Sequence, residues 1–165
     1  MIGSSRIVGC DSTGLLSLVA AMVEGLSARL RRVVDALPLE PGMRVLEIGG
    51  APGAAARVVA EVVGSTGHVL VLDRSAKGIA LTEAHCADEI ERGVLSVLCA
   101  EVEGFTLPLT TQRFDLAFAC RVGVLDGRHP AQYELALARI ADALAPHGRL
   151  FVDTGDPLDE VPLAR

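Results

Sequence analysis

Short apolar runs alternate with longer helical patterns through most of this chain, and this alternation constrains the fold more than any other feature. The short runs are rich in Val, Leu and Ile, which is typical of buried strands. We expect five strands, at residues 44–48, 68–72, 95–99, 114–119 and 149–153. Helices are expected between them at 54–63, 76–91 and 132–144. Strands that alternate with helices pack as a parallel sheet, so the sequence predicts an α/β fold with a doubly wound, mainly parallel sheet of about five strands.

The two ends of the 165-residue chain flank this core, which we place at residues 43–153 within a single domain. Residues 1–37 are expected to form an extra N-terminal helical segment, because apolar residues recur at helical spacing until Pro38 ends the run. The arginines of this segment, Arg29, Arg31 and Arg32, are interpreted as its solvated face. Residues 154–165 form a short tail that contains two prolines. This organisation leaves the fifth strand at the edge of the sheet.

The first strand leads into a glycine-rich loop at residues 49–53, where the next helix begins. Small residues let a ligand approach the backbone closely, and a helix N-terminus favours negative charge. The second strand ends at Asp73, which lies 20 positions beyond Gly53. A carboxylate at that point can accept hydrogen bonds from both hydroxyls of a ribose. The loop and Asp73 together indicate a ligand that contains adenosine.

A nicotinamide dinucleotide is the competing ligand for this loop. Its fingerprint requires glycine at positions 49, 51 and 54, but positions 51 and 54 are alanine. The second of those glycines lets the backbone approach the pyrophosphate, whereas Ala51 places a Cβ there. Arg74 is suited to a 2′-phosphate. The dinucleotide is therefore disfavoured and remains an alternative.

Four segments resemble motifs of the class I S-adenosylmethionine-dependent methyltransferases. Residues 45–53 (VLEIGGAPG) are similar to the first motif of that family, and residues 71–73 (VLD) to its ribose-binding strand end. Residues 114–119 (FDLAFA) resemble the fourth-strand motif, and residues 143–150 (ALAPHGRL) the turn before the fifth strand. The resemblance implies a Rossmann-like sheet in the order 3-2-1-4-5 with helices on both faces. It also implies S-adenosylmethionine as the cofactor and S-adenosylhomocysteine as its product.

The resemblance assigns cofactor-binding roles to residues at the strand ends. Those expected against the methionine and ribose belong to the first motif: Glu47, Gly49, Gly50, Ala51 and Gly53. Among them, Glu47 would hold the methionine amino group. Those expected at the ribose and adenine follow the second and third strands: Asp73, Arg74, Ala100, Glu101 and Val102. After the fourth strand, Cys120 and Arg121 are expected near the methionine end.

No sharp catalytic motif stands out, and methyl transfer does not require one. The cofactor carries an activated methyl group, so the protein mainly aligns the reactants and excludes water. Where a base is needed, His129 and Asp126 in the loop after the fourth strand are the candidates. The competing interpretation is a turn at Asp126-Gly127 and a surface histidine. No motif for a metal site occurs, so no metal is expected.

The sequence predicts an S-adenosylmethionine-dependent methyltransferase that acts on a small-molecule acceptor. The alternative is a non-catalytic S-adenosylmethionine-binding module or partner subunit. Two further alternatives are less favoured: an RNA methyltransferase, because the loop variant Ala51-Pro52-Gly53 also resembles that of some RNA methyltransferases, and an NAD(P)-binding protein. The net charge of -6 and the 3% content of aromatic residues disfavour a nucleic-acid partner. The apolar edge of the fifth strand favours a homodimer or a partner subunit, because uncovered edges pair with other chains.

The cysteines and the apolar runs bear on location. The four cysteines, at positions 10, 86, 99 and 120, follow neither a zinc nor a disulfide pattern and are expected to be buried free thiols in a reducing compartment. No apolar run approaches the roughly 20 residues that span a bilayer. We therefore expect a soluble, cytoplasmic protein that does not bind membranes.

Overall fold

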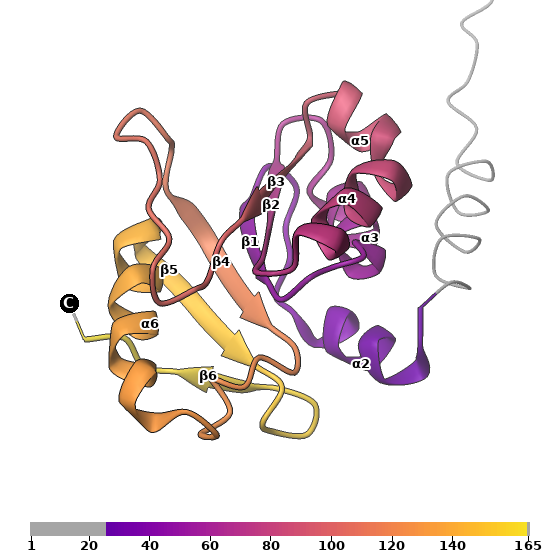
Figure 1. The fold of residues 1–165 in the computed structure, drawn as a ribbon. Helices are drawn as coiled ribbons and strands as arrows, with labels where there is room; N and C mark the ends of the chain where they lie inside the picture. The colour runs from indigo at the N-terminus through magenta and orange to yellow at the C-terminus, as the bar shows by residue number, and fades with distance from the viewer. Residues whose placement is uncertain (1–25, 165) are drawn as a thin grey trace, which may run out of the picture.

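Six strands form one sheet with helices on both faces (Figure 1) in the computed structural model, which describes residues 26–164. The strands are β1 (Arg44–Ile48), β2 (His68–Asp73), β3 (Leu95–Cys99), β4 (Phe114–Ala119), β5 (Leu144–Val152) and β6 (Asp159–Val161). The helices are α2 (Ala28–Ala36), α3 (Ala54–Val63), α4 (Ala76–His85), α5 (Ala87–Glu91) and α6 (Pro130–Ala143). The sheet order is β3-β2-β1-β4-β5-β6, and β6 alone runs antiparallel to its neighbour. The predicted α/β fold and its 3-2-1-4-5 order are confirmed.

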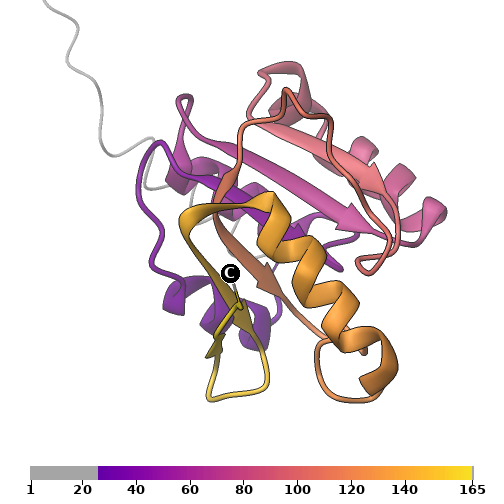
Figure 2. The same cartoon turned by 90° about the vertical axis from the view of Figure 1, so that its left-hand side faces the viewer.

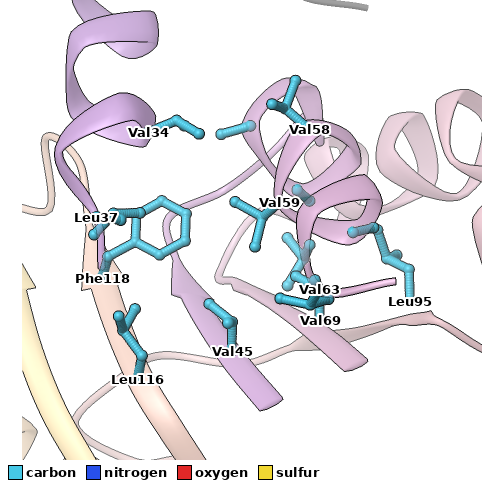
Figure 3. Packing of buried hydrophobic residues seen from close by; sticks show 14 of the residues in the cluster. Val34, Leu37, Val45, Val58, Val59, Val63, Val69, Leu95, Leu116 and Phe118 are labelled. Carbon is cyan, nitrogen blue, oxygen red and sulfur yellow. The ribbon is translucent and has the colours of Figure 1, made fainter. Parts of the chain in front are cut away.

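Alternate residues of the strands fill two cores, one on each face of the sheet. On one face, Val45 and Phe118 pack with residues of α2 and α3 such as Val59 (Figure 3). On the other face, Leu46 and Leu150 pack with residues of α6. Figure 2 shows α6 lying across this second face. Because both faces are covered, the central strands are apolar along nearly their whole length, which is the pattern that made them recognisable in the sequence.

The described part of the N-terminal segment is α2, which covers one end of the first core. The Ser27 hydroxyl caps this helix by accepting a hydrogen bond from Leu30 N at 3.3 Å. The helix ends at Ala36, before Pro38, and buries Val33 and Val34. The rest of the helical segment predicted at residues 1–37 lies outside the described residues.

β6 corrects the expectation that β5 is an uncovered edge strand. Residues 159–161 pair with residues 150–152, and the Arg149 guanidinium donates to both oxygens of Glu160 at 3.0 and 2.6 Å. A three-residue strand beside two prolines has too little periodicity to be predicted. The tail therefore covers the edge through which a homodimer or partner subunit was expected to form, and the association itself stays a prediction.

Several element boundaries also differ from the expected ones, and two of the differences are larger than two residues. β5 begins at Leu144 instead of residue 149, and its pairing with β4 is irregular between Phe114 and Leu116, where the additional residues are accommodated. The single helix expected at 76–91 is divided at Cys86, whose φ of -110° and ψ of 24° are not helical. The apolar spacing continues across this break, so the pattern did not reveal it.

The cysteines are only partly as expected. Cys86 is a buried free thiol and Cys120 is partly buried, but Cys99 is exposed at the end of β3, and Cys10 lies outside the described residues. Within residues 26–164, no helix has the length and apolar character needed to cross a bilayer.

Candidate functional site

Two cavities open where the loops leave the carboxyl ends of the strands. The first has a volume of about 400 Å³ and the second of about 310 Å³, and Gly49 and Arg121 line both of them. Gly49 follows β1 and Arg121 follows β4, so the cavities meet where the sheet order changes direction. This switch point is where ligands bind in open parallel sheets.

The first cavity collects most of the residues expected at a ribose and adenine. The predicted residues that line it are Gly49, Asp73, Arg74, Ala100, Glu101, Val102, Arg121 and His129. Sequence reasoning missed further lining residues, chiefly those of the loop after β4 and the start of α6: Val122, Gly123, Val124, Arg128 and Gln132. Their position after a central strand end was the available signal, but no residue pattern showed which of them turn inward.

Asp73 is held rigidly between two loops. Its Oδ2 accepts a hydrogen bond from Ala51 N at 3.3 Å, and its Oδ1 accepts one from Ser75 N at 2.8 Å. An ionised carboxylate has about four acceptor positions, so two backbone donors leave capacity for ligand hydroxyls. The structure thus presents an anchored carboxylate at the wall of the first cavity.

The second cavity lies between the glycine loop and α2. The predicted residues that line it are Glu47, Gly49, Gly50, Ala51, Cys120 and Arg121. The residues that sequence reasoning missed come mainly from α2 and its cap and from the position after β5: Ser27, Arg29, Leu30, Val33 and Asp153, with Pro52 and Ala54 from the glycine loop and the start of α3. In particular, Arg29 lines this cavity, which its interpretation as part of a solvated face did not anticipate, although its side chain is 49% exposed.

Glu47 is an acid buried beside the glycine loop. Only 3% of it is exposed, and its Oε2 has no hydrogen-bond partner among the described residues. Its pKa is raised to about 8, chiefly by burial; a backbone hydrogen bond from Ala56 opposes the rise and the negative charge of Asp73 contributes to it. A Cβ on Gly50 would lie 2.5 Å from Glu47 Cδ, so only glycine leaves room for this carboxyl group. A cationic ligand group would supply the missing partner of Glu47.

Cys120 lies across the same cavity as a neutral thiol. Burial, together with the negative charges of Asp153 and Glu47, raises its pKa to about 12. A thiol in this state is a weak nucleophile. Its role in the cavity is therefore one of packing.

Gly53 does not line either cavity. It is the N-cap of α3, with a left-handed φ of 91°, and a Cβ there would lie 2.7 Å from Cys86 Sγ and 2.8 Å from Thr82 Cγ2. Its small size lets the start of α3 pack closely against the end of α4. The cofactor contact expected of Gly53 remains a proposal without a cavity wall to support it.

The two candidate bases lie in different surroundings. His129 is a wall residue of the first cavity at the start of α6. Asp126 is absent from the residues that line this cavity, and its partly buried carboxylate accepts hydrogen bonds from Arg128 Nε at 2.9 and 2.8 Å. These bonds lower the pKa of Asp126 and make it a poorer base. The geometry thus brings His129, and not Asp126, to the cavity.

Residues 45–148 match the model of a protein family described as a methyltransferase domain. The matched span covers more than half of the chain and includes the glycine loop and the loops after β2, β3 and β4, which line the cavities. The chain belongs to this methyltransferase family.

This methyltransferase domain is similar to longer curated proteins. It is 32% identical over 133 residues to the ubiquinone/menaquinone biosynthesis C-methyltransferase UbiE of Bordetella parapertussis, a match that covers 77% of this chain and 48% of the relative. A shorter match, 48% identical over 42 residues, is to the protein-L-isoaspartate O-methyltransferase of Methanothermobacter thermautotrophicus and covers 26% of this chain and 19% of the relative. The chain thus spans about half the length of the first relative and about a fifth of the second.

Solved structures share the fold of the methyltransferase domain. An arsenic (III) S-adenosylmethionine methyltransferase from Chlamydomonas reinhardtii superposes with a TM-score of 0.59 at 21% identity, covering 81% of this chain and 47% of that one. A SAM-dependent methyltransferase from Aquifex aeolicus gives a TM-score of 0.59 at 19% identity, with 87% and 72% covered. The Rossmann-like fold of class I S-adenosylmethionine-dependent methyltransferases is thereby confirmed.

The residues of the methyltransferase domain fit the cofactor of its family. The first cavity offers the carboxylate of Asp73 to a ribose, and the second offers the unpartnered oxygen of Glu47 to an ammonium group. S-adenosylmethionine carries both groups, joined through its sulfur. Among residues 26–164, no cluster of three or more His, Cys, Asp or Glu side chains is placed to hold a metal ion.

Proposed function

We propose that this domain transfers the methyl group of S-adenosylmethionine to a small-molecule acceptor. The observation that carries the proposal is the pair of cavities that meet at Gly49 and Arg121. One holds an anchored carboxylate and the other a buried acid with an unpartnered oxygen. When bound, S-adenosylmethionine supplies an activated methyl group on its sulfonium sulfur.

In this proposal the chain holds the two ends of the cofactor in separate cavities. Asp73 accepts hydrogen bonds from the ribose hydroxyls, while Arg74 and residues 100–102 border the adenine. Glu47 binds the methionine ammonium through its free oxygen. With both ends held, the sulfur lies near the junction at Gly49, where an acceptor can be aligned for in-line displacement.

His129 is the proposed base where the acceptor needs to lose a proton. It lines the first cavity from the N-cap position of α6. Its ring lies close to Gly123, where an added Cβ would be 3.3 Å from His129 Cδ2. A histidine can take up a proton near neutral pH.

A small-molecule acceptor is supported by one of the two curated relatives, by a structural neighbour and by charge, whereas the other curated relative is a protein-L-isoaspartate O-methyltransferase. The Bordetella relative is a C-methyltransferase of ubiquinone/menaquinone biosynthesis, and the Chlamydomonas structural neighbour methylates arsenic (III). The net charge of -6 opposes general association with nucleic acid. The second candidate function is a non-catalytic cofactor-binding module, which would use the same two cavities to hold the cofactor without transferring its methyl group.

Transfer from methyl-labelled S-adenosylmethionine tests the proposal. The purified protein is incubated with the labelled donor and with phenols, hydroquinones, amines and thiols in turn, and S-adenosylhomocysteine is measured as well as label in the acceptor. Methyl transfer to one acceptor class supports the catalytic function, provided that Asp73→Ala lowers the rate of transfer at limiting donor concentration. Cofactor binding without transfer to any class supports the binding module, and a protein that binds neither donor nor product contradicts both functions.

A further inference from the structure

The helix α2 contributes a cation to the second cavity. Arg29 lies in the first turn of α2 and lines this cavity, with 49% of its side chain exposed. Arg32, one turn further along, lies outside the lining of the cavity and forms an ion pair with the exposed Asp156. The two arginines thus join the same helix to the same loop after β5, but only Arg29 faces the cavity.

Asp153 holds Arg29 in place. Its side chain is only 5% exposed, and its Oδ2 accepts a hydrogen bond from Arg29 Nη2 at 2.5 Å. Its Oδ1 accepts a second bond from Arg121 N at 3.0 Å. Arg121 has a φ of 57°, a left-handed conformation that is uncommon outside glycine. One buried carboxylate therefore fixes both the Arg29 side chain and the Arg121 backbone.

The charges of this cavity match an amino-acid group. Glu47 presents an unpartnered carboxyl oxygen, which suits an ammonium group. A guanidinium has five N–H donors, so the bond from Arg29 to Asp153 leaves others for a ligand carboxylate. Guanidinium and carboxylate groups form strong charge-assisted hydrogen bonds, often two in parallel. An amino-acid zwitterion needs one anionic and one cationic partner, and the cavity offers both.

We propose that Arg29 binds the carboxylate at the amino-acid end of the donor and that Asp153 is the positioning residue that holds Arg29 there. The inference rests on the proposed function, because it concerns the second cavity of the same donor site. It makes α2, which lies outside the matched family span of 45–148, a part of the binding site. The competing interpretation is that the Arg29–Asp153 pair only attaches α2 to the domain.

Calorimetry with two ligands separates these interpretations. S-adenosylhomocysteine carries the amino-acid end, whereas 5′-methylthioadenosine has the same adenosine and sulfur without it. Arg29→Met is expected to weaken binding of S-adenosylhomocysteine by about 10–100-fold and of methylthioadenosine by less than about twofold. Arg32→Met is the matched control and is expected to leave both affinities unchanged.

Two further variants address folding and positioning. Arg29→Lys keeps the charge without the fork of donors, and it is expected to lose less affinity for S-adenosylhomocysteine than Arg29→Met while keeping the stability of the wild type. Asp153→Asn keeps an acceptor for Arg121 N but removes the ion pair with Arg29. Like Arg29→Met, it is expected to weaken binding of S-adenosylhomocysteine more than binding of methylthioadenosine.

Each result decides the question. Equal losses for both ligands in Arg29→Met and Arg29→Lys, or no loss in either, would overturn the inference and leave the proposed function standing. A wild-type protein that binds neither ligand would overturn the proposed function and the inference with it.

Discussion

The backbone N–H of Ala51 donates a hydrogen bond to Oδ2 of Asp73 at 3.3 Å, and this bond joins the glycine loop after β1 to the end of β2. The two segments are 22 residues apart in the chain, and each borders one of the two cavities. The same carboxylate also receives the N–H of Ser75, which caps α4. Asp73 is therefore both a structural link and the proposed ribose ligand.

Replacing Asp73 should weaken the donor site. We expect Asp73→Ala to weaken binding of S-adenosylhomocysteine by roughly 1–3 kcal/mol, because charge-assisted hydrogen bonds to the ribose are lost. Calorimetry measures the affinity, and urea unfolding separates it from any loss of stability. Asp115→Ala is the control, since Asp115 also accepts a backbone N–H, from Arg44 at 2.8 Å, at the opposite end of the sheet. Equal affinities of the two variants would contradict the assignment.

Glu47 should make the stability of the domain depend on pH. Its pKa is about 8 in the folded protein against 4.5 for an exposed glutamate, so the folded state keeps a proton that the unfolded chain releases between these values. The free energy of unfolding should therefore fall as pH rises through this window, by an amount on the order of 3–5 kcal/mol, and level off above it. Glu47→Gln should lack this contribution and gain stability relative to the wild type at high pH. Urea unfolding at about pH 5 and about pH 9 measures the difference. Parallel pH profiles for the two proteins would exclude the raised pKa.

The same carboxyl group should couple donor binding to proton release. An ammonium group paired with Glu47 favours its ionised form, so binding of S-adenosylhomocysteine near pH 7 should release close to one proton. Calorimetry in buffers of different ionisation enthalpy measures this number. Glu47→Gln and 5′-methylthioadenosine, which has no ammonium group, are the two controls and should release none. Proton release that is unchanged in Glu47→Gln would assign it to another group.

Gly53 should matter for stability more than for binding. Gly53→Ala combines a left-handed φ of 91° with a Cβ 2.7 Å from Cys86 Sγ, whereas Gly93→Ala has a comparable φ of 75° and open space around the added atom. The strain common to both is about 1 kcal/mol, and the close contact should add about 1–3 kcal/mol in Gly53→Ala. Urea unfolding of both variants measures the difference. A Gly53→Ala protein as stable as Gly93→Ala, with its affinity for S-adenosylhomocysteine lost, would instead favour a direct cofactor contact.

The sequence predicted the central sheet well because its strands are buried on both faces. The expected ranges of β1, β3 and β4 match the observed ones. β1 and β4 are buried at most of their positions, whereas β3 is a partly buried edge strand that was recognised from its Leu and Val residues. β6 could not be predicted, since its three residues gain their strand conformation only by pairing with β5. The error over the sheet edge followed directly from missing that strand.

In the candidate site, too, some residues could be predicted from the sequence and others could not. Asp73 and the glycine loop could be predicted because strand ends and small residues are local signals. Arg29 could not, because its place in the cavity depends on Asp153, which is 124 residues away in the chain. The loop after β4 also gave no pattern that distinguishes His129, which faces the cavity, from Asp126, which pairs with Arg128.

The central claim is that the two cavities hold S-adenosylmethionine, and titration calorimetry of the wild-type protein with S-adenosylhomocysteine and with NADH tests it most directly. The account predicts saturable, one-to-one binding of S-adenosylhomocysteine and no heat with NADH, because Ala51 occupies the position where a pyrophosphate needs glycine. Binding of NADH without binding of S-adenosylhomocysteine would contradict it.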